Sequence, residues 1–158
     1  MGSRLQLDSL DRRILSVLMQ DARTPYLEIA RRCSVSGAAI HQRINRMTAA
    51  GLIKGSSLNL DMHLLGWMTC AFVGIQINLT ASTTHQEVFD QISRVPEIVE
   101  CHHITGKYSL LAKIYAENNE HLKQILVEKI QSIPEVVATE TLISLEEGFT
   151  RPVRTELP

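Results

Sequence analysis

Residues 25–54 read PYLEIARRCSVSGAAIHQRINRMTAAGLIK, and this stretch decides the fold of the first part of the chain. Apolar residues repeat at helical spacing on both sides of a tight turn at residues 33–35. The first side predicts a short helix that begins near Pro25, and the second predicts a longer helix that Ser36 caps and Gly51 ends. A short helix, a turn of about three residues and a longer capped helix describe a helix-turn-helix.

A further helix is predicted upstream of this motif. The spacing of Leu10, Ile14 and Leu15 predicts a helix from about residue 9 to residue 20. Asp8 is the expected N-cap, and Asp11 adds a favourable negative charge to the first turn. The three predicted helices form a small domain, and the last of them has its own buried stripe. This stripe consists of Ile40, Ile44 and Met47.

The longer helix keeps a polar face opposite its buried stripe, as a helix that enters the major groove of DNA requires. Residues 52–58 are expected to follow as a small hairpin or wing, with Lys54 placed for a backbone phosphate. Arg43 is expected either to contact a phosphate or to support the fold. The alternative for the whole motif is an interaction module whose polar face is only solvated. The predicted DNA-binding residues are Ser36, Gly37, Ala38, His41, Gln42, Arg43, Asn45, Arg46 and Lys54.

Charge is divided unevenly along the chain, although the formal net charge of all 158 residues is only -1. The part that ends at Leu60 carries nine basic and four acidic side chains, a net charge of +5. The rest carries seven basic and thirteen acidic side chains, a net charge of -6. This asymmetry favours a basic nucleic-acid-binding part joined to an acidic part with another task.

The composition excludes several classes of protein. With 44% hydrophobic and 21% charged residues, the chain is neither disordered nor fibrous in character. It has no run of about 18 apolar residues, so no membrane association is expected, and its start lacks the pattern of a secretory signal. The three cysteines Cys33, Cys70 and Cys101 are far apart and cannot all pair, which predicts a reduced cytoplasmic protein.

The second half of the chain alternates between strand and helix patterns. The predicted elements are a strand over residues 69–79, a helix capped by Thr83 or Thr84, strands over 99–104 and 108–115, a helix that begins at Asn118 or Asn119, and a strand over 136–145. An internal repeat supports this order, because the Ile-x-x-Val-Pro-Glu-Ile-Val of residues 92–99 returns as Ile-x-x-Ile-Pro-Glu-Val-Val at residues 130–137.

The order βαββαβ with two matched halves predicts a ferredoxin-like sheet, so the predicted fold class is α+β. The predicted domains are a helix-turn-helix domain at residues 1–60, a linker at 61–68 and a ferredoxin-like domain at 69–158.

Both faces of this predicted sheet are poor in charge. In the first strand Val73 and Ile75 point to one face, while Cys70 and Phe72 point to the other. Two helices can cover only one face, and large exposed apolar patches are rare in monomers. The second face therefore predicts a homodimer in which two sheets pack together around a two-fold axis.

A set of ordered motifs in the first part of the chain also resembles a known family. The motifs are Leu7-Asp8-x-x-Asp11-x-x-Ile14-Leu15, Asp21-Ala22-Arg23, Glu28-Ile29-Ala30, Val35-Ser36, Arg43-Ile44-x-Arg46-Met47 and Gly51-Leu52-Ile53-Lys54-Gly55. They resemble the Lrp/AsnC transcription regulators, which are also called leucine-responsive or feast/famine regulators. Ser34 stands where the turn commonly has Gly, and Gly37 stands where the recognition helix often begins with Pro.

The resemblance extends to nearly the whole chain, because the predicted ferredoxin-like half is similar to the regulatory ligand-binding domain of this family. It implies larger even assemblies such as octamers, and a small amino acid bound in a cleft between dimers. In the family a Gly-x-Tyr/Asn-Asp turn lies at this cleft, and the present chain has Gly-Lys-Tyr-Ser at residues 106–109. The effector-binding residues implied or expected here are Gly106, Tyr108, Ser109, Thr139 and Thr141.

Ser109 replaces the carboxylate that would meet the ammonium group of an effector. The missing charge-assisted hydrogen bond, about 1.5–3 kcal/mol, weighs against an ordinary amino acid. A plain β-turn with surface threonines is the alternative for this segment.

No cofactor, metal or catalytic site is predicted. Cys101 and His103 share one face of a strand and His102 points away, so the triplet cannot chelate one ion. No phosphate-binding glycine loop, nucleophile elbow or zinc-helix motif is present. The predicted function is therefore a sequence-specific regulator of transcription that binds double-stranded DNA and responds to an amino acid or related small molecule. The alternatives are an architectural DNA-compacting protein, an enzyme-regulatory subunit that senses a small molecule, and a metabolic enzyme.

Overall fold

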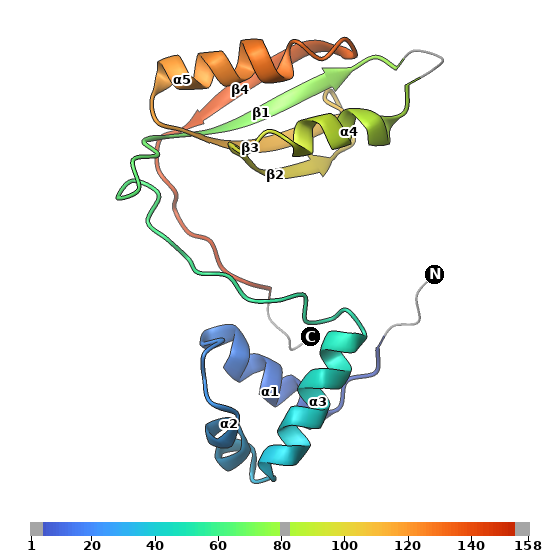
Figure 1. The fold of residues 1–158 in the computed structure, drawn as a ribbon, viewed down its shortest axis with the longest axis vertical. Helices are drawn as coiled ribbons and strands as arrows, with labels where there is room; N and C mark the ends of the chain where they lie inside the picture. The colour runs from blue at the N-terminus through green and yellow to red at the C-terminus, as the bar shows by residue number, and fades with distance from the viewer. Residues whose placement is uncertain (1–4, 80–82, 154–158) are drawn as a thin grey trace. The chain divides into compact units, whose positions relative to one another are not determined.

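The computed structural model describes residues 5–79 and 83–153 (Figure 1). Its contacts divide the chain into two units, Met1–Asn59 with Phe149–Pro158 and Leu60–Gly148. The predicted second domain extends to the end of the chain. The last strand, β4, ends at Ser144, and among the described residues those at 149–153 group with the first unit.

The described helices of the first unit are α1 (Ser9–Gln20), α2 (Tyr26–Cys33) and α3 (Gly37–Ala49). At the start of α1, the backbone N–H of Asp11 donates to Asp8 Oδ1 at 2.8 Å, and the N–H of Asp8 donates to Asp11 Oδ2 at 3.1 Å. At the start of α3, the Ser36 hydroxyl accepts from the N–H of Ala39. Both predicted N-caps are confirmed, reciprocally at α1 and by a single bond at α3, and they satisfy N–H groups that have no partner inside the helix.

The turn between α2 and α3 depends on a left-handed residue. Ser34 has φ 57° and ψ 43°, and the next N–H, that of Val35, donates to the carbonyl of Ala30 at 3.1 Å. This conformation costs a residue with a Cβ atom about 1–2 kcal/mol. Ser34 therefore adopts the backbone geometry that Gly would adopt without this cost.

Each helix of the first unit contributes fully buried residues to one core. Ile14 of α1, Ile29 of α2 and Ile40 and Met47 of α3 have no exposed surface. The predicted buried stripe of α3 is confirmed, and it leaves the opposite side of this helix in solvent.

The predicted hairpin or wing over residues 52–58 is wrong. No strand forms there in the described part of the chain. The N–H groups of Leu52 and Ile53 both donate to the carbonyl of Met47 and so finish α3, and Gly55 follows with φ +143°. A hairpin needs a second strand that pairs with the first, and Gly55 in this segment has low strand propensity.

The second unit has the predicted order βαββαβ. Its elements are β1 (Thr69–Ile77), α4 (His85–Ser93), β2 (Ile98–His103), β3 (Leu110–Ala116), α5 (Asn119–Gln124) continued by the π-helical turn η1 (Ile125–Ile130), and β4 (Val136–Ser144). Thr84 caps α4 and Asn118 caps α5, each from the position at which the sequence predicts a helix start. All strand pairs are antiparallel, in the order β2-β3-β1-β4.

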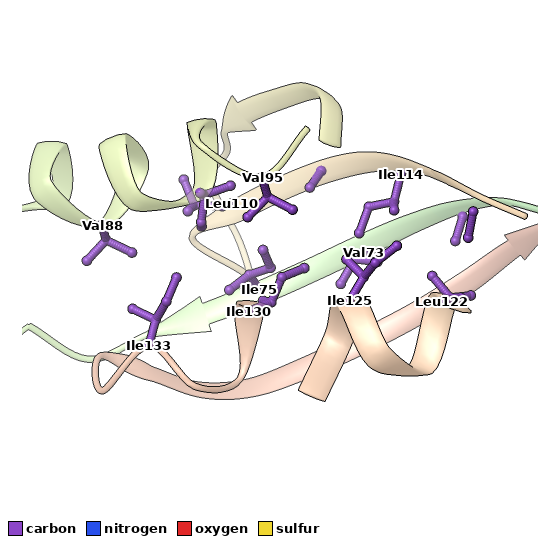
Figure 2. Packing of buried hydrophobic residues seen from close by; sticks show 14 residues of the cluster. Val73, Ile75, Val88, Val95, Leu110, Ile114, Leu122, Ile125, Ile130 and Ile133 are labelled. Carbon is purple, nitrogen blue, oxygen red and sulfur yellow. The ribbon is translucent and has the colours of Figure 1, made fainter. Parts of the chain in front are cut away.

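Both helical segments cover the same face of the sheet. Val73 and Ile75 of β1 pack in one buried cluster with Val88 of α4 and Ile125 of η1 (Figure 2). The predicted orientation of β1 is confirmed, since Phe72, which precedes Val73 in the strand, lies on the opposite face and is 36% exposed. The helices therefore leave one face of the sheet for other contacts.

The internal repeat forms two equivalent turns. Before β2 the N–H of Ile98 donates to the carbonyl of Val95 at 3.0 Å, and before β4 the N–H of Val136 donates to that of Ile133 at the same distance. In both copies a proline follows the last helical turn and directs the chain back into the sheet. Among the helices in the described ranges, none is long and apolar enough to cross a membrane.

Candidate nucleic-acid interface and effector site

The exposed side of α3 carries most of the predicted DNA-binding residues. Ser36, Ala38, His41, Gln42, Asn45 and Arg46 are exposed, whereas Gly37 and Arg43 are partly buried. Lys54 is exposed on the irregular segment that follows α3, and not on a wing. The structure thus brings the polar residues of α3 together on one helix face and leaves Lys54 near the end of that helix.

Arg43 and Arg46 are held by acidic residues at the start of α1. Asp11 is completely buried, and its Oδ1 lies 2.9 Å from Arg43 Nη1 while its Oδ2 accepts from Arg46 Nη2. Arg43 Nη1 also donates to Asp8. Of the two roles predicted for Arg43, the structure shows support of the fold. Arg46 is half exposed, so one side of its guanidinium remains available to a phosphate.

These contacts shift two pKa values. The hydrogen bond from Arg43 and that from the Asp11 backbone lower the pKa of Asp8 from 3.8 to about 2. The hydrogen bonds to Asp8 and Asp11 raise the pKa of Arg43 above its usual value. Both side chains are therefore charged at neutral pH, and α3 is attached to α1 through opposite charges.

Three side chains form a second cluster on the other flank of α3. The rings of Tyr26 and His41 meet edge to face, with centroids 5.8 Å apart and an interplanar angle of 71°. The amide nitrogen of Asn45 lies 3.1 Å from His41 Nδ1. Tyr26 is absent from the predicted contact residues, because neither periodicity nor a motif marks it. Its place directly after Pro25, in the first turn of α2, is the only local signal.

Gly37 allows α2 and α3 to approach closely. A Cβ atom at Gly37 would lie 3.1 Å from Leu27 Cδ2, which is tighter than most real contacts of this kind. Gly at the first position of α3 therefore leaves room for Leu27 where the two helices meet.

The turn that precedes β3 places Tyr108 against the sheet. Gly106 has φ +118°, and the Tyr108 ring covers Gly74, where a Cβ atom would lie 2.6 Å from Tyr108 Cδ2. The Tyr108 hydroxyl oxygen is buried and has no hydrogen-bond partner among the described residues. Lys107 Nζ lies 4.8 Å from the centroid of this ring and 3.0 Å from Glu140 Oε2. An aromatic ring, a cation and an unpaired hydroxyl therefore meet at this turn.

Thr139 and Thr141 lie on the other face of the sheet. Thr139 pairs with Ile75 and Thr141 with Val73, whose side chains point toward the helices, and Gln131 Nε2 donates to Thr139 Oγ1 at 2.8 Å. Within one copy of the domain, these threonines do not line a cleft with Tyr108. The predicted cleft lies between dimers, so the grouping of all five residues in it stays a prediction.

The Cys-His-His triplet is divided between the faces of β2, as predicted. His103 Nε2 lies 3.2 Å from His85 Nδ1 of α4, whereas His102 Nε2 lies 2.7 Å from Glu100 Oε1. Burial raises the pKa of the Cys101 thiol. In the described ranges no three His, Cys, Asp or Glu side chains are grouped closely enough to hold a metal ion.

Two family models match the two units. One describes the AsnC-type helix-turn-helix domain and matches residues 7–48, and the other describes the Lrp/AsnC ligand binding domain and matches residues 70–153. The chain belongs to the Lrp/AsnC family. It is therefore a transcriptional regulator with a helix-turn-helix domain and a ligand-binding domain, as predicted.

Relatives of the Lrp/AsnC family match along almost the whole chain. The regulatory protein AsnC of Haemophilus influenzae is 38% identical over 148 residues, which cover 94% of this chain and 97% of the relative. The HTH-type transcriptional regulator FL11 of Pyrococcus horikoshii is 34% identical over 155 residues, which cover 98% of each chain.

Solved Lrp/AsnC structures have the same fold. The structure of Escherichia coli AsnC is 33% identical, covers 95% of this chain and 99% of its own, and superimposes with a TM-score of 0.87. A transcriptional regulator of Neisseria meningitidis in complex with L-Met has a TM-score of 0.85 at 21% identity and covers 97% of each chain. The latter match concerns the fold alone.

Proposed function

We propose that this regulator acts by placing α3 in the major groove of double-stranded DNA. The observation that supports this most strongly is the division of α3 into two sides. Asp11 and the core hold one side, while the exposed side presents His41, Gln42 and Asn45, whose side chains form hydrogen bonds with base edges in other complexes. Arg46 and Lys54 supply positive charge for phosphates, which positions the helix but does not read sequence.

We further propose that two copies pair through the face of the sheet that the helices leave open. Phe72 of β1 and Leu142 of β4 are cross-strand neighbours on this face and are 36% and 58% exposed. Burial of such a patch stabilises a two-fold dimer. A dimer of this kind presents two copies of α3 to half-sites about 34 Å apart or a multiple of that distance. Octamers built from such dimers are the larger assembly that we propose.

The turn at residues 106–109 is the proposed effector site. The unpaired hydroxyl of Tyr108 and the nearby ammonium group of Lys107 suit a small amino-acid-like molecule that has a carboxylate. Ser109 has no charge to offer to the ammonium group of the effector. A thermal-shift screen of the twenty amino acids at about millimolar concentration tests this site, since a ligand that binds the native state raises the melting temperature.

We assign this chain a regulatory role in the cytoplasm and no catalytic role. The relatives named above are transcriptional regulators, and the free cysteines Cys33, Cys70 and Cys101 suit a reducing compartment.

Selection of bound DNA from genomic fragments is the decisive experiment for this function. A sequence-specific regulator enriches a common site, and its affinity for that site exceeds its non-specific affinity by about 10³ or more. A ratio near one would instead identify an architectural DNA-compacting protein. Absence of DNA binding at low salt would favour an enzyme-regulatory subunit.

A further inference from the structure

The cluster on the flank of α3 controls the orientation of one imidazole. Tyr26 comes from α2, while His41 and Asn45 lie one turn apart on α3. The Tyr26 ring stands edge-on to the His41 ring, and the Asn45 amide nitrogen is 3.1 Å from His41 Nδ1. His41 is thus held by two neighbours, although its own side chain is exposed.

The contact with Asn45 favours one tautomer of His41. An amide nitrogen donates hydrogen bonds and does not accept them, so His41 Nδ1 is the acceptor in the contact with Asn45. A neutral imidazole has one N–H group, which then lies on Nε2. The edge-to-face contact with Tyr26 favours one position of the ring. His41 therefore offers a single, oriented N–H donor on the exposed face of α3.

We propose that Tyr26 and Asn45 are positioning residues that hold His41 as an Nε2–H donor, and that His41 donates this hydrogen bond to guanine. In the major groove guanine presents two acceptors, N7 and O6, side by side, whereas adenine has an amino donor beside its N7. The proposal rests on the proposed function, because it requires α3 to lie in the major groove. Gln42, the next residue, is outside the cluster.

The first experiment measures the protonation of His41 without DNA. Long-range proton–nitrogen correlation spectra of protein labelled at histidine are recorded at slightly alkaline pH, and the His41 signals are assigned from their loss in His41→Gln. We expect the Nε2–H form in the wild-type protein and a mixture of both forms in Asn45→Ala. A dominant Nδ1–H form in the wild type would overturn the proposal.

The second experiment compares base preferences in DNA selected from a random pool. We expect His41→Ala to reduce the preference for guanine at one base pair of each half-site by about tenfold, within the range for one specific contact. Tyr26→Ala and Asn45→Ala are expected to relax the same base pair. Tyr26→Phe, the matched control, keeps the ring and the preference. Because both residues act through His41, the variant Tyr26→Ala/His41→Ala loses no more than His41→Ala alone.

The outcomes separate this inference from the function on which it rests. If the wild-type protein selects no sequence, the proposed function fails. If His41→Ala changes the selected site while Tyr26→Ala and Asn45→Ala leave it unchanged, or if the effects simply add, the positioning inference fails and the function stands. A base other than guanine at the position that His41 controls overturns the assignment of the base. Should Tyr26→Ala prove unfolded by thermal melting, Asn45→Ala and the spectra of His41 still decide the question.

Discussion

Asp11 of α1 and Arg43 of α3 form an ion pair in which Oδ1 and Nη1 are 2.9 Å apart and the carboxylate has no exposed surface. The same carboxylate accepts from Arg46 and completes the cap of α1 through the N–H of Asp8. One side chain therefore determines both where the first helix begins and how the recognition helix is held against it.

We expect Asp11→Ala to lower the free energy of unfolding by about 3 kcal/mol. This value is the low end of the destabilisation that follows when one partner of a buried ion pair is removed. We expect the low end because the Arg43 and Arg46 side chains, which lose their partner, keep some contact with water. Urea unfolding of the full chain measures the change. Glu28→Ala is the control, since it removes an exposed i,i+4 pair with Arg32 and is expected to cost less than about 1 kcal/mol. Equal losses in the two variants would contradict a special role of Asp11.

Asp8 makes part of this stability depend on pH. The hydrogen bond from Arg43 lowers the pKa of Asp8 to about 2 in the folded state. Because this value is below the unfolded one, the stabilisation is complete above about pH 4 and is lost as the pH falls toward 2. The difference in unfolding free energy between the wild type and Asp8→Asn is expected to be constant from about pH 5 to 7 and to shrink below about pH 4. A difference that is as large at about pH 2 as at neutral pH would refute the assignment.

We expect Lys54→Ala to weaken binding to all DNA sequences by a similar factor. A lysine that contacts a phosphate releases a counterion, so the slope of log affinity against log salt should become shallower by about 1. Lys123→Ala removes the same charge from an exposed position in the other unit and should leave the slope unchanged. An altered base preference in Lys54→Ala would show that this lysine contacts bases.

Gly74→Ala is expected to destabilise the second unit by about 1–3 kcal/mol, because its Cβ atom would overlap the Tyr108 ring. Gly148→Ala is the control, since apart from its chain neighbours no heavy atom of the described residues lies within 4 Å of the corresponding Cβ position. In a Tyr108→Ala background the cost of Gly74→Ala should be much smaller, because the ring is gone. Chemical denaturation of the four variants measures these differences, and an undiminished cost in that background would mean that the clash lies elsewhere.

The proposed dimer is tested by a charge on its apolar face. We expect Leu142→Glu to turn the dimer into a monomer at micromolar concentration, as measured by light scattering, because an unpaired carboxylate in a packed interface is strongly unfavourable. Val127→Glu is the control, because Val127 is similarly exposed, at 51%, but belongs to η1 on the helical side of the sheet. A monomeric wild-type protein would exclude this interface altogether.

Local patterns in the sequence predicted most of the elements, because their signals lie within a few residues. The caps Asp8, Ser36 and Thr84 each accept from an N–H three residues ahead, so the start of a helix can be read without knowledge of the fold. The buried stripe of α3 follows in the same way from its spacing.

Contacts between distant segments had no such signal. Tyr26 and His41 meet across two helices, α2 and α3. The face on which Thr139 lies depends on the register of β4 against β1, which shifts between Gln76 and Ile77. A shift of one residue moves every side chain of a strand to the other face, and no short pattern specifies it. The hairpin predicted after α3 failed for a related reason, because a strand requires a partner that the local sequence does not reveal.

The two-sided construction of α3 has a consequence for how members of a family diverge. Arg43, Ile44 and Met47 are committed to α1 and to the core, so substitutions there are costly to folding. The exposed residues Ala38, Gln42 and Asn45 have no such role in folding, so substitutions at these three positions leave the fold intact. New preferences for DNA sequence can therefore arise from substitutions at a few solvent-facing positions. For the same reason, the DNA preference of this fold can be redesigned without mutations that compensate for lost stability.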